Sequence, residues 1–196
     1  MGRLITYIGG ARSGKSRLAQ ERVNGPGSVV YVATATRIDH GGSQNDPEME
    51  ARIARHRQDR PAEWITIEEP LDLTQAFERA AEHKPRAILL DCLTLWLSNR
   101  LLKCWPMDET ASGIPASWDD AAETEVLADM EKSLSFGKKT SNELVVVSND
   151  VGGGLVPLHP MGRAFRDMHG RANQRLGGVA DEVHWVLAGL SLKMKG

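Results

Sequence analysis

Short runs of apolar residues recur along the chain, and stretches with a helical spacing of apolar side chains separate them. Consecutive apolar residues, many of them β-branched, predict strands buried on both faces, as in a parallel sheet covered by helices. We expect strands at residues 4–8, 28–33, 86–91 and 144–148, an alternating strand at 64–67, and closing strands at 182–188 and 189–195.

The intervening stretches carry apolar residues three and four positions apart, which is the period of a helix packed against a core. We predict helices at 16–23, 47–59, 72–83, 93–102, 118–134 and 161–176. The repeated order of strand, loop and helix predicts a single α/β domain over residues 1–196 with a mostly parallel sheet.

The turn after the first strand fits the phosphate-binding pattern G-x-x-x-x-G-K-[ST] at every required position. Its glycines let successive backbone N–H groups point at one anion, and the following helix adds the positive end of its dipole. We therefore predict a P-loop NTPase-like three-layer sandwich, with Lys15 on the β- and γ-phosphates and the Ser16 hydroxyl on Mg²⁺. The motif comprises Gly9, Gly10, Ala11, Arg12, Ser13, Gly14, Lys15 and Ser16.

Two other predicted strands end in polar residues where a nucleotide would bind. Asp91 follows the apolar run Ala87–Leu90. In many P-loop proteins an acidic residue at the end of an apolar strand reaches Mg²⁺, so we expect Asp91 to be a metal ligand. Thr34, Ala35 and Thr36, two of which carry hydroxyls, follow the second strand, and parallel sheets bind ligands at this edge. They are candidates for nucleotide contact, although a merely polar strand exit explains them equally well.

The predicted helix at 47–59 is rich in cations. Arg52, His56 and Arg60 form one row at intervals of four, and Arg55 and Arg57 flank it. Neighbouring arginines favour the neutral, nucleophilic imidazole and would attract polyphosphate. A packing role for His56 and a solvated basic face are the alternatives.

Composition adds exclusions. The 196 residues include 41% hydrophobic and 26% charged side chains and carry a net charge of −2, which favours neither nucleic acid nor an anionic membrane surface as a partner. No apolar run approaches the ~18 residues of a membrane span, so we expect no membrane insertion. Two cysteines, Cys92 and Cys104, favour a reducing cytoplasm, and the histidines outside the 47–59 helix have no zinc-ligand spacing.

The chain resembles the bifunctional adenosylcobinamide kinase / adenosylcobinamide-phosphate guanylyltransferase family of vitamin B12 biosynthesis nearly end to end. The resemblance rests on the P-loop and on several further segments. These are Tyr31–Thr34, Arg52–Arg57 with Arg60-Pro61, Leu89–Thr94, Val147–Gly152, Phe165–Asp167, Gly170-Arg171, Asn173–Leu176 and Ala180–Val183.

The resemblance implies two reactions. The γ-phosphoryl group of ATP or GTP passes to the hydroxyl of the aminopropanol arm of adenosylcobinamide. A histidine, matched here by His56, then takes GMP from GTP and transfers it to the new phosphate, giving adenosylcobinamide-GDP. The resemblance further implies a homotrimer, and contacts to GTP or its metal from Thr34, Ala35, Thr36, Arg57, Gln58, Asp59, Arg60, Glu68 and Asp91.

Two other functions remain open on the residues alone. A P-loop small-molecule kinase without nucleotidyltransferase activity would use Lys15 and Asp91 and leave His56 as a packing residue. A GTPase-type binding module is disfavoured because the chain has no Asn/Thr-Lys-x-Asp motif to read guanine.

Overall fold

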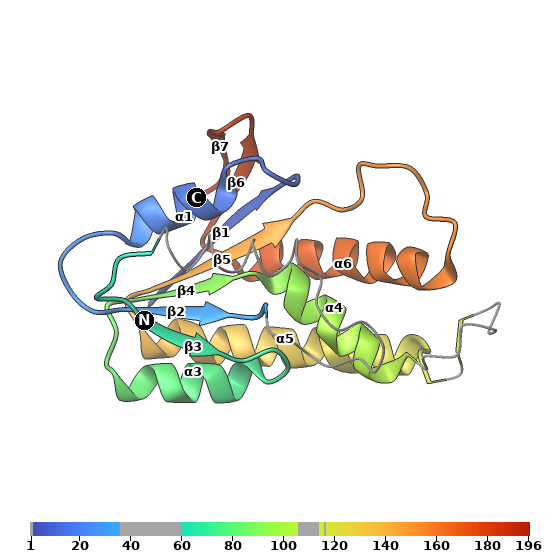
Figure 1. The fold of residues 1–196 in the computed structure, drawn as a ribbon, viewed down its shortest axis with the longest axis horizontal. Coiled ribbons are helices and arrows are strands. Elements are labelled where there is room, and N and C mark those ends of the chain that lie inside the picture. Colours follow the sequence, from blue (N-terminus) through green and yellow to red (C-terminus); the bar gives the residue numbers. More distant parts are fainter. Residues whose placement is uncertain (1, 36–59, 106–113, 116) are drawn as a thin grey trace.

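The computed structural model describes residues 2–35, 60–105, 114–115 and 117–196. Its central feature is a seven-stranded sheet in the order β3-β2-β4-β5-β1-β6-β7 (Figure 1). All neighbouring strands are parallel except β6 and β7, which form an antiparallel pair at one edge. The strands are β1 Arg3–Gly9, β2 Val29–Ala33, β3 Ile65–Glu68, β4 Ala87–Asp91, β5 Glu143–Asn149, β6 Glu182–Leu187 and β7 Leu190–Lys195.

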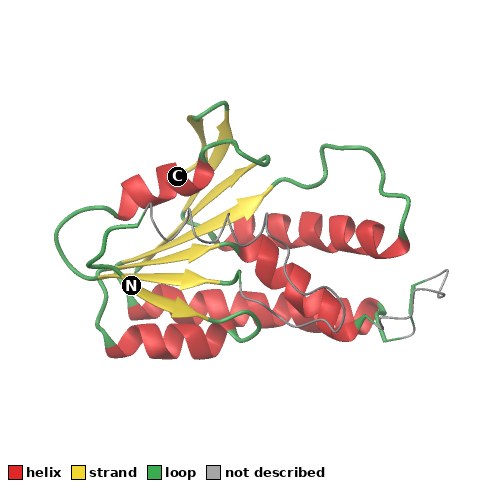
Figure 2. Ribbon diagram, viewed as in Figure 1, coloured by secondary structure: helices red, strands yellow, loops and turns green. Residues whose placement is uncertain are grey.

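The described helices cover both faces of this sheet (Figure 2). They are α1 Lys15–Val23, α3 Leu73–Glu82, α4 Leu93–Cys104, α5 Asp120–Thr140 and α6 Pro160–Val179. Side chains of α3, α4, α5 and α6 share one apolar core with one face of the sheet, whereas Ala19 and Val23 of α1 pack into a second core on the other face. The predicted three-layer α/β sandwich is therefore confirmed.

The strands follow from the apolar runs. Every residue of β2 is buried, and β5 is buried from Leu144 to Ser148, as consecutive apolar positions predict for strands covered on both faces. The alternating run at 64–67 forms the edge strand β3, in which Ile67 is buried while Thr66 and Glu68 are exposed. The predicted helix at 47–59 lies outside the described residues.

Helix α5 is the described helix that extends furthest beyond its prediction. Helix α5 continues to Thr140, whereas the apolar spacing predicts an end near Leu134. The extra turns pass through Gly137, where an added Cβ would lie 3.0 Å from the Phe77 ring of α3 and 3.1 Å from Leu144 of β5. The glycine thus permits close packing and does not end the helix. Within the described ranges, no helix combines the length and apolarity needed to cross a bilayer.

Candidate functional site

The P-loop and the carboxyl ends of β2, β4 and β5 meet at one edge of the sheet. The loop joins β1 to α1, and β5 lies between β1 and β4 in the sheet (Figure 1). Residues far apart in the sequence, such as Ser16 and Asp91, are therefore brought together. This is the edge at which open parallel sheets bind ligands.

Backbone geometry explains two of the P-loop glycines. Gly14 precedes α1 with φ of 96°, a left-handed conformation that glycine adopts at little cost. A Cβ on Gly9 would lie 2.3 Å from the carbonyl oxygen of Val186 and 2.8 Å from Ser13 Oγ. The turn between β6 and β7 supports the loop from outside, because Gly189 N–H donates to Ser13 O at 2.8 Å.

Two polar groups lie inside the loop. The Lys15 side chain is 7% exposed, and its ammonium donates to Gly10 O at 3.0 Å, which keeps the positive charge against the loop. Ser13 Oγ is buried and has no hydrogen-bond partner among the described residues. A bound phosphate would give this buried hydroxyl the hydrogen-bond partner that it lacks.

Ser16 and Asp91, the two predicted metal ligands, lie next to each other. Ser16 Oγ lies 3.4 Å from Asp91 Oδ1. Mg²⁺ binds oxygens at about 2.1 Å in an octahedron, so adjacent ligands lie about 3 Å apart, and this pair fits that geometry with a small adjustment. Among the described residues no group of three or more His, Cys, Asp or Glu side chains could hold a metal. The pair suits a hard cation whose remaining ligands are phosphate oxygens and water.

A tyrosine that sequence reasoning did not single out connects this pair to Arg60. Tyr31 donates its hydroxyl hydrogen to Asp91 Oδ2 at 2.9 Å, and the Arg60 guanidinium lies 3.5 Å from the centre of the Tyr31 ring. Burial, and secondly the Asp91 charge, raise the pKa of Tyr31 well above its usual value, so the phenol remains a donor at neutral pH. A tyrosine within a buried apolar strand is expected to be a core residue. Its hydroxyl was the only sequence signal of a contact with Asp91.

The exit of β2 is fixed to the exit of β4 by Thr34. Its hydroxyl donates to Cys92 O at 2.7 Å and accepts from Cys92 N–H at 3.1 Å, and Thr34 O accepts from the Asn99 amide at 3.0 Å. Thr34 is fully buried. Its polar atoms thus hold Asp91 in place through the backbone, and its contact with nucleotide stays a prediction, as does that of the partly buried Ala35.

A depression of about 350 Å³ lies beside this cluster, along β3. Arg60 and Glu68 are on its wall together with Pro61, Ala62, Trp64 and Thr66. Arg60 Nε is buried without a hydrogen-bond partner in the described part of the chain, and such a donor suits an anionic or carbonyl oxygen of a ligand. Two predicted nucleotide contacts therefore share one hollow, and one of them, Arg60, also packs on the Tyr31 ring.

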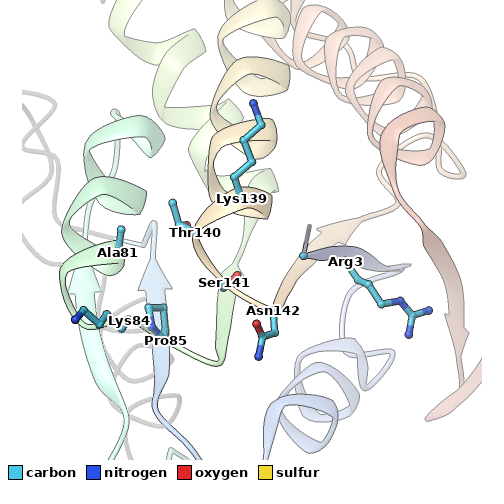
Figure 3. A pocket seen from close by; sticks show the side chains of 9 residues that line it. Arg3, Ala81, Lys84, Pro85, Lys139, Thr140, Ser141 and Asn142 are labelled. Carbon is cyan, nitrogen blue, oxygen red and sulfur yellow. The ribbon is translucent and has the colours of Figure 1, made fainter.

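A larger depression, of about 680 Å³, lies at the opposite edge of the sheet (Figure 3). Its cations Arg3, Lys84 and Lys139 point apart in Figure 3 and do not converge on a common point. Helices α3 and α5 both end there, and cations near helix C-termini balance the negative ends of the helix dipoles. Its charge is therefore explained without a ligand.

The structure brings together the P-loop, Asp91, Arg60 and Glu68 among the predicted site residues. Thr34 and Ala35 lie at the exit of β2, whereas Thr36, His56, Arg57, Gln58 and Asp59 lie outside the described residues.

Comparisons with known proteins agree with one another on a family. The family model described as cobinamide kinase / cobinamide phosphate guanyltransferase matches residues 5–194. The bifunctional adenosylcobalamin biosynthesis protein CobU of Escherichia coli (strain K12) is 36% identical over 194 residues, which cover 98% of this chain and 99% of that protein. CobU of Salmonella typhimurium is 36% identical over 195 residues, with the same coverage. CobP of Pseudomonas aeruginosa, of the same printed description, is 38% identical over 190 residues, 96% of this chain and 95% of its own length.

Proposed function

This chain belongs to the cobinamide kinase / cobinamide phosphate guanyltransferase family, and from that premise we propose that it catalyses both reactions in adenosylcobalamin biosynthesis. It phosphorylates adenosylcobinamide with ATP or GTP and then transfers GMP from GTP to the phosphate, giving adenosylcobinamide-GDP. The observation that carries the proposal is a series of contacts: Arg60 packs on Tyr31, Tyr31 donates to Asp91, and Asp91 accepts from Ser16. This series connects Arg60, the last residue of the arginine-rich segment 52–60 that contains His56, to the P-loop.

The kinase step needs positioning and neutralisation of charge more than covalent chemistry. The amides of Gly9–Ser16 and the Lys15 ammonium bind the β- and γ-phosphates. Ser16 and Asp91 would hold Mg²⁺, which supplies charge neutralisation between these phosphates. The acceptor hydroxyl attacks the γ-phosphorus as the bond to the bridging oxygen breaks, and the nucleoside diphosphate leaves.

The guanylyltransferase step needs a nucleophile. In our proposal the neutral His56 imidazole attacks the α-phosphorus of GTP and pyrophosphate leaves, and the phosphate of adenosylcobinamide phosphate then displaces histidine from the GMP group. Arg57, Gln58, Asp59 and Arg60 contact the nucleotide. The buried Arg60 Nε, which has no hydrogen-bond partner among the described residues, and the hollow that Arg60 shares with Glu68 support a nucleotide contact at this end of the segment.

We further propose that the protein is a homotrimer that acts in the cytoplasm. The free thiols of Cys92 and Cys104 favour a reducing compartment. Self-association is supported by the β6–β7 hairpin, where Leu187, Leu190, Leu192 and Met194 are all more than 60% exposed. Large exposed apolar patches of this kind mark interaction surfaces.

Two labels distinguish the proposal from its alternatives. The enzyme is supplied with adenosylcobinamide and either γ-labelled ATP or α-labelled GTP together with unlabelled ATP. Both labels should reach the corrinoid product. Transfer of the γ-label alone would leave a kinase, whereas slow nucleotide hydrolysis independent of the corrinoid would indicate a GTPase-type module.

A further inference from the structure

Asn149 ends β5 at a central position of the nucleotide edge. Strand β5 lies between the P-loop strand β1 and the Asp91 strand β4. In register, Asn149 pairs with Gly9, the first P-loop glycine, and Val147 pairs with Asp91. Asn149 is therefore level with the start of the P-loop and two residues beyond the metal carboxylate.

The alternation of the strand places Asn149 on the nucleotide face. Val145 and Val147 pack into the same core as Ala19 and Val23 of the P-loop helix, and side chains two residues apart share a face of a strand. Asp91 lies on this face of β4 by the same rule, since Ala87 and Leu89 are members of that core. Asn149 and Asp91 thus flank the phosphate site from neighbouring strands.

The backbone around Asn149 is held on every side. Its N–H donates to Thr94 Oγ1 at 2.8 Å, and its carbonyl accepts from the Asn173 amide at 2.9 Å. The next N–H, that of Asp150, donates to Gly9 O at 2.9 Å. Among the described residues, the Asn149 carboxamide itself has no hydrogen-bond partner. The side chain is therefore presented by a rigid backbone and keeps its donors and acceptor available.

The anchor of Thr94 is a buried neutral histidine. His169 is 1% exposed, its Nε2 lies 3.0 Å from Thr94 Oγ1, and burial lowers the pKa of His169 to about 4. The Asn173 amide lies 3.4 Å from His169 Nδ1 and, as the donor there, leaves the ring hydrogen on Nε2, so Thr94 Oγ1 accepts from both Asn149 N–H and His169 Nε2–H. The β5 exit is thereby tied to the first turn of α4, the helix that follows β4.

We propose that Asn149 is a catalytic residue of the kinase step that binds the transferred γ-phosphoryl group through its Nδ2–H. This inference rests on the proposed function. The hydroxyl oxygen of the acceptor forms the new bond to phosphorus and the bridging oxygen departs with the nucleoside diphosphate. The hydroxyl proton leaves to solvent, and Asn149 exchanges none. Guanylyl transfer reacts at the α-phosphorus, two phosphates away, and does not depend on this contact.

The test compares Asn149→Ala with a matched control. Asn142→Ala removes an exposed asparagine just before β5, at the opposite end of the same strand. Phosphorylation of adenosylcobinamide is measured with γ-labelled ATP, and guanylyl transfer is measured separately with preformed adenosylcobinamide phosphate and GTP. We expect kinase kcat to fall about 100-fold in Asn149→Ala, as on loss of one preorganised donor. Guanylyl transfer and all rates of Asn142→Ala should stay within about threefold of the wild type.

Asn149→Asp keeps the shape of the side chain and replaces the donor by a carboxylate. Because this charge repels the γ-phosphate, its kinase rate should lie below that of Asn149→Ala. The inference is overturned if kinase kcat survives in either variant, or if both activities fall together. A wild type that does not phosphorylate adenosylcobinamide would instead refute the proposed function, before any variant is compared.

Discussion

Asp91 divides its two carboxylate oxygens between two partners. Oδ2 accepts the Tyr31 hydroxyl hydrogen and Oδ1 faces Ser16. The phenol thus fixes the orientation in which Oδ1 can reach a metal ion. A group that orients a metal ligand in this way commonly contributes tenfold to hundredfold in metal affinity.

Tyr31→Phe tests this orientation. The variant keeps the ring beneath Arg60 and removes the hydroxyl, so the Mg²⁺ concentration for half-maximal kinase rate should rise about tenfold. Tyr7→Phe is the matched control, because the Tyr7 ring stacks on His184 and makes no contact with Asp91. An unchanged Mg²⁺ requirement in Tyr31→Phe would show that the phenol does not position the carboxylate.

His169 makes stability depend on pH. Its pKa is about 4 in the fold, below the ordinary value of 6.5, because burial disfavours the charged ring. The unfolded chain binds this proton more readily. The contribution of the neutral His169 ring to the free energy of unfolding is therefore fully present above pH 6.5 and is lost as pH falls towards 4. The two pKa values correspond to a loss of about 3 kcal/mol.

Denaturant unfolding of the wild type and His169→Gln between pH 7 and 4 measures this effect. Carboxylates titrate in both proteins, so the difference between the two curves isolates the imidazole. The wild type should lose more unfolding free energy than the variant over this range. Parallel curves would contradict a buried neutral His169.

At the scale of elements, the P-loop depends on contact with the closing hairpin. Gly9→Ala would place its Cβ 2.3 Å from Val186 O of β6, so β1 and β6 would have to separate. We expect a loss of about 2–3 kcal/mol in unfolding free energy. Gly10→Ala is the control, since nothing lies within 4 Å of its added Cβ and its stability should change by less than about 0.5 kcal/mol. Equal stability of both variants would exclude the close approach.

The sequence predicted the individual strands and helices better than it predicted which of them lie side by side. Apolar runs identified the described strands, and the two motifs predicted that Ser16 and Asp91 lie close together, as they do; their role as metal ligands stays a prediction. Local periodicity does not determine strand order. The sequence therefore did not predict that β5 lies between β1 and β4, or that Asn149 lies beside the P-loop. The role of Tyr31 could not be predicted for another reason. Its strand is a run of apolar residues and alanine, and only the fold brings the Tyr31 hydroxyl to Asp91.

At the scale of the whole molecule, β7 leaves an apolar face at the end of the sheet. Register pairs Trp185 with Leu192 and Leu187 with Leu190, so these side chains share one face. A homotrimer built on this face predicts that Leu192→Lys yields monomers by light scattering. Lys193→Gln, on the other face of β7, should leave the oligomer intact. Trimers that persist in Leu192→Lys would exclude this surface.

In the proposed guanylyl transfer the GMP group passes through the protein itself, on His56. Intact-mass measurement after exposure to GTP and Mg²⁺ tests this most directly, with His56→Ala as the variant and His83→Ala, an exposed histidine, as the control. We predict an adduct of one GMP in the wild type and in His83→Ala, sensitive to acid and stable in base. His56→Ala should carry none and still phosphorylate adenosylcobinamide. A wild type without the adduct, or an equal adduct on His56→Ala, would contradict transfer through His56.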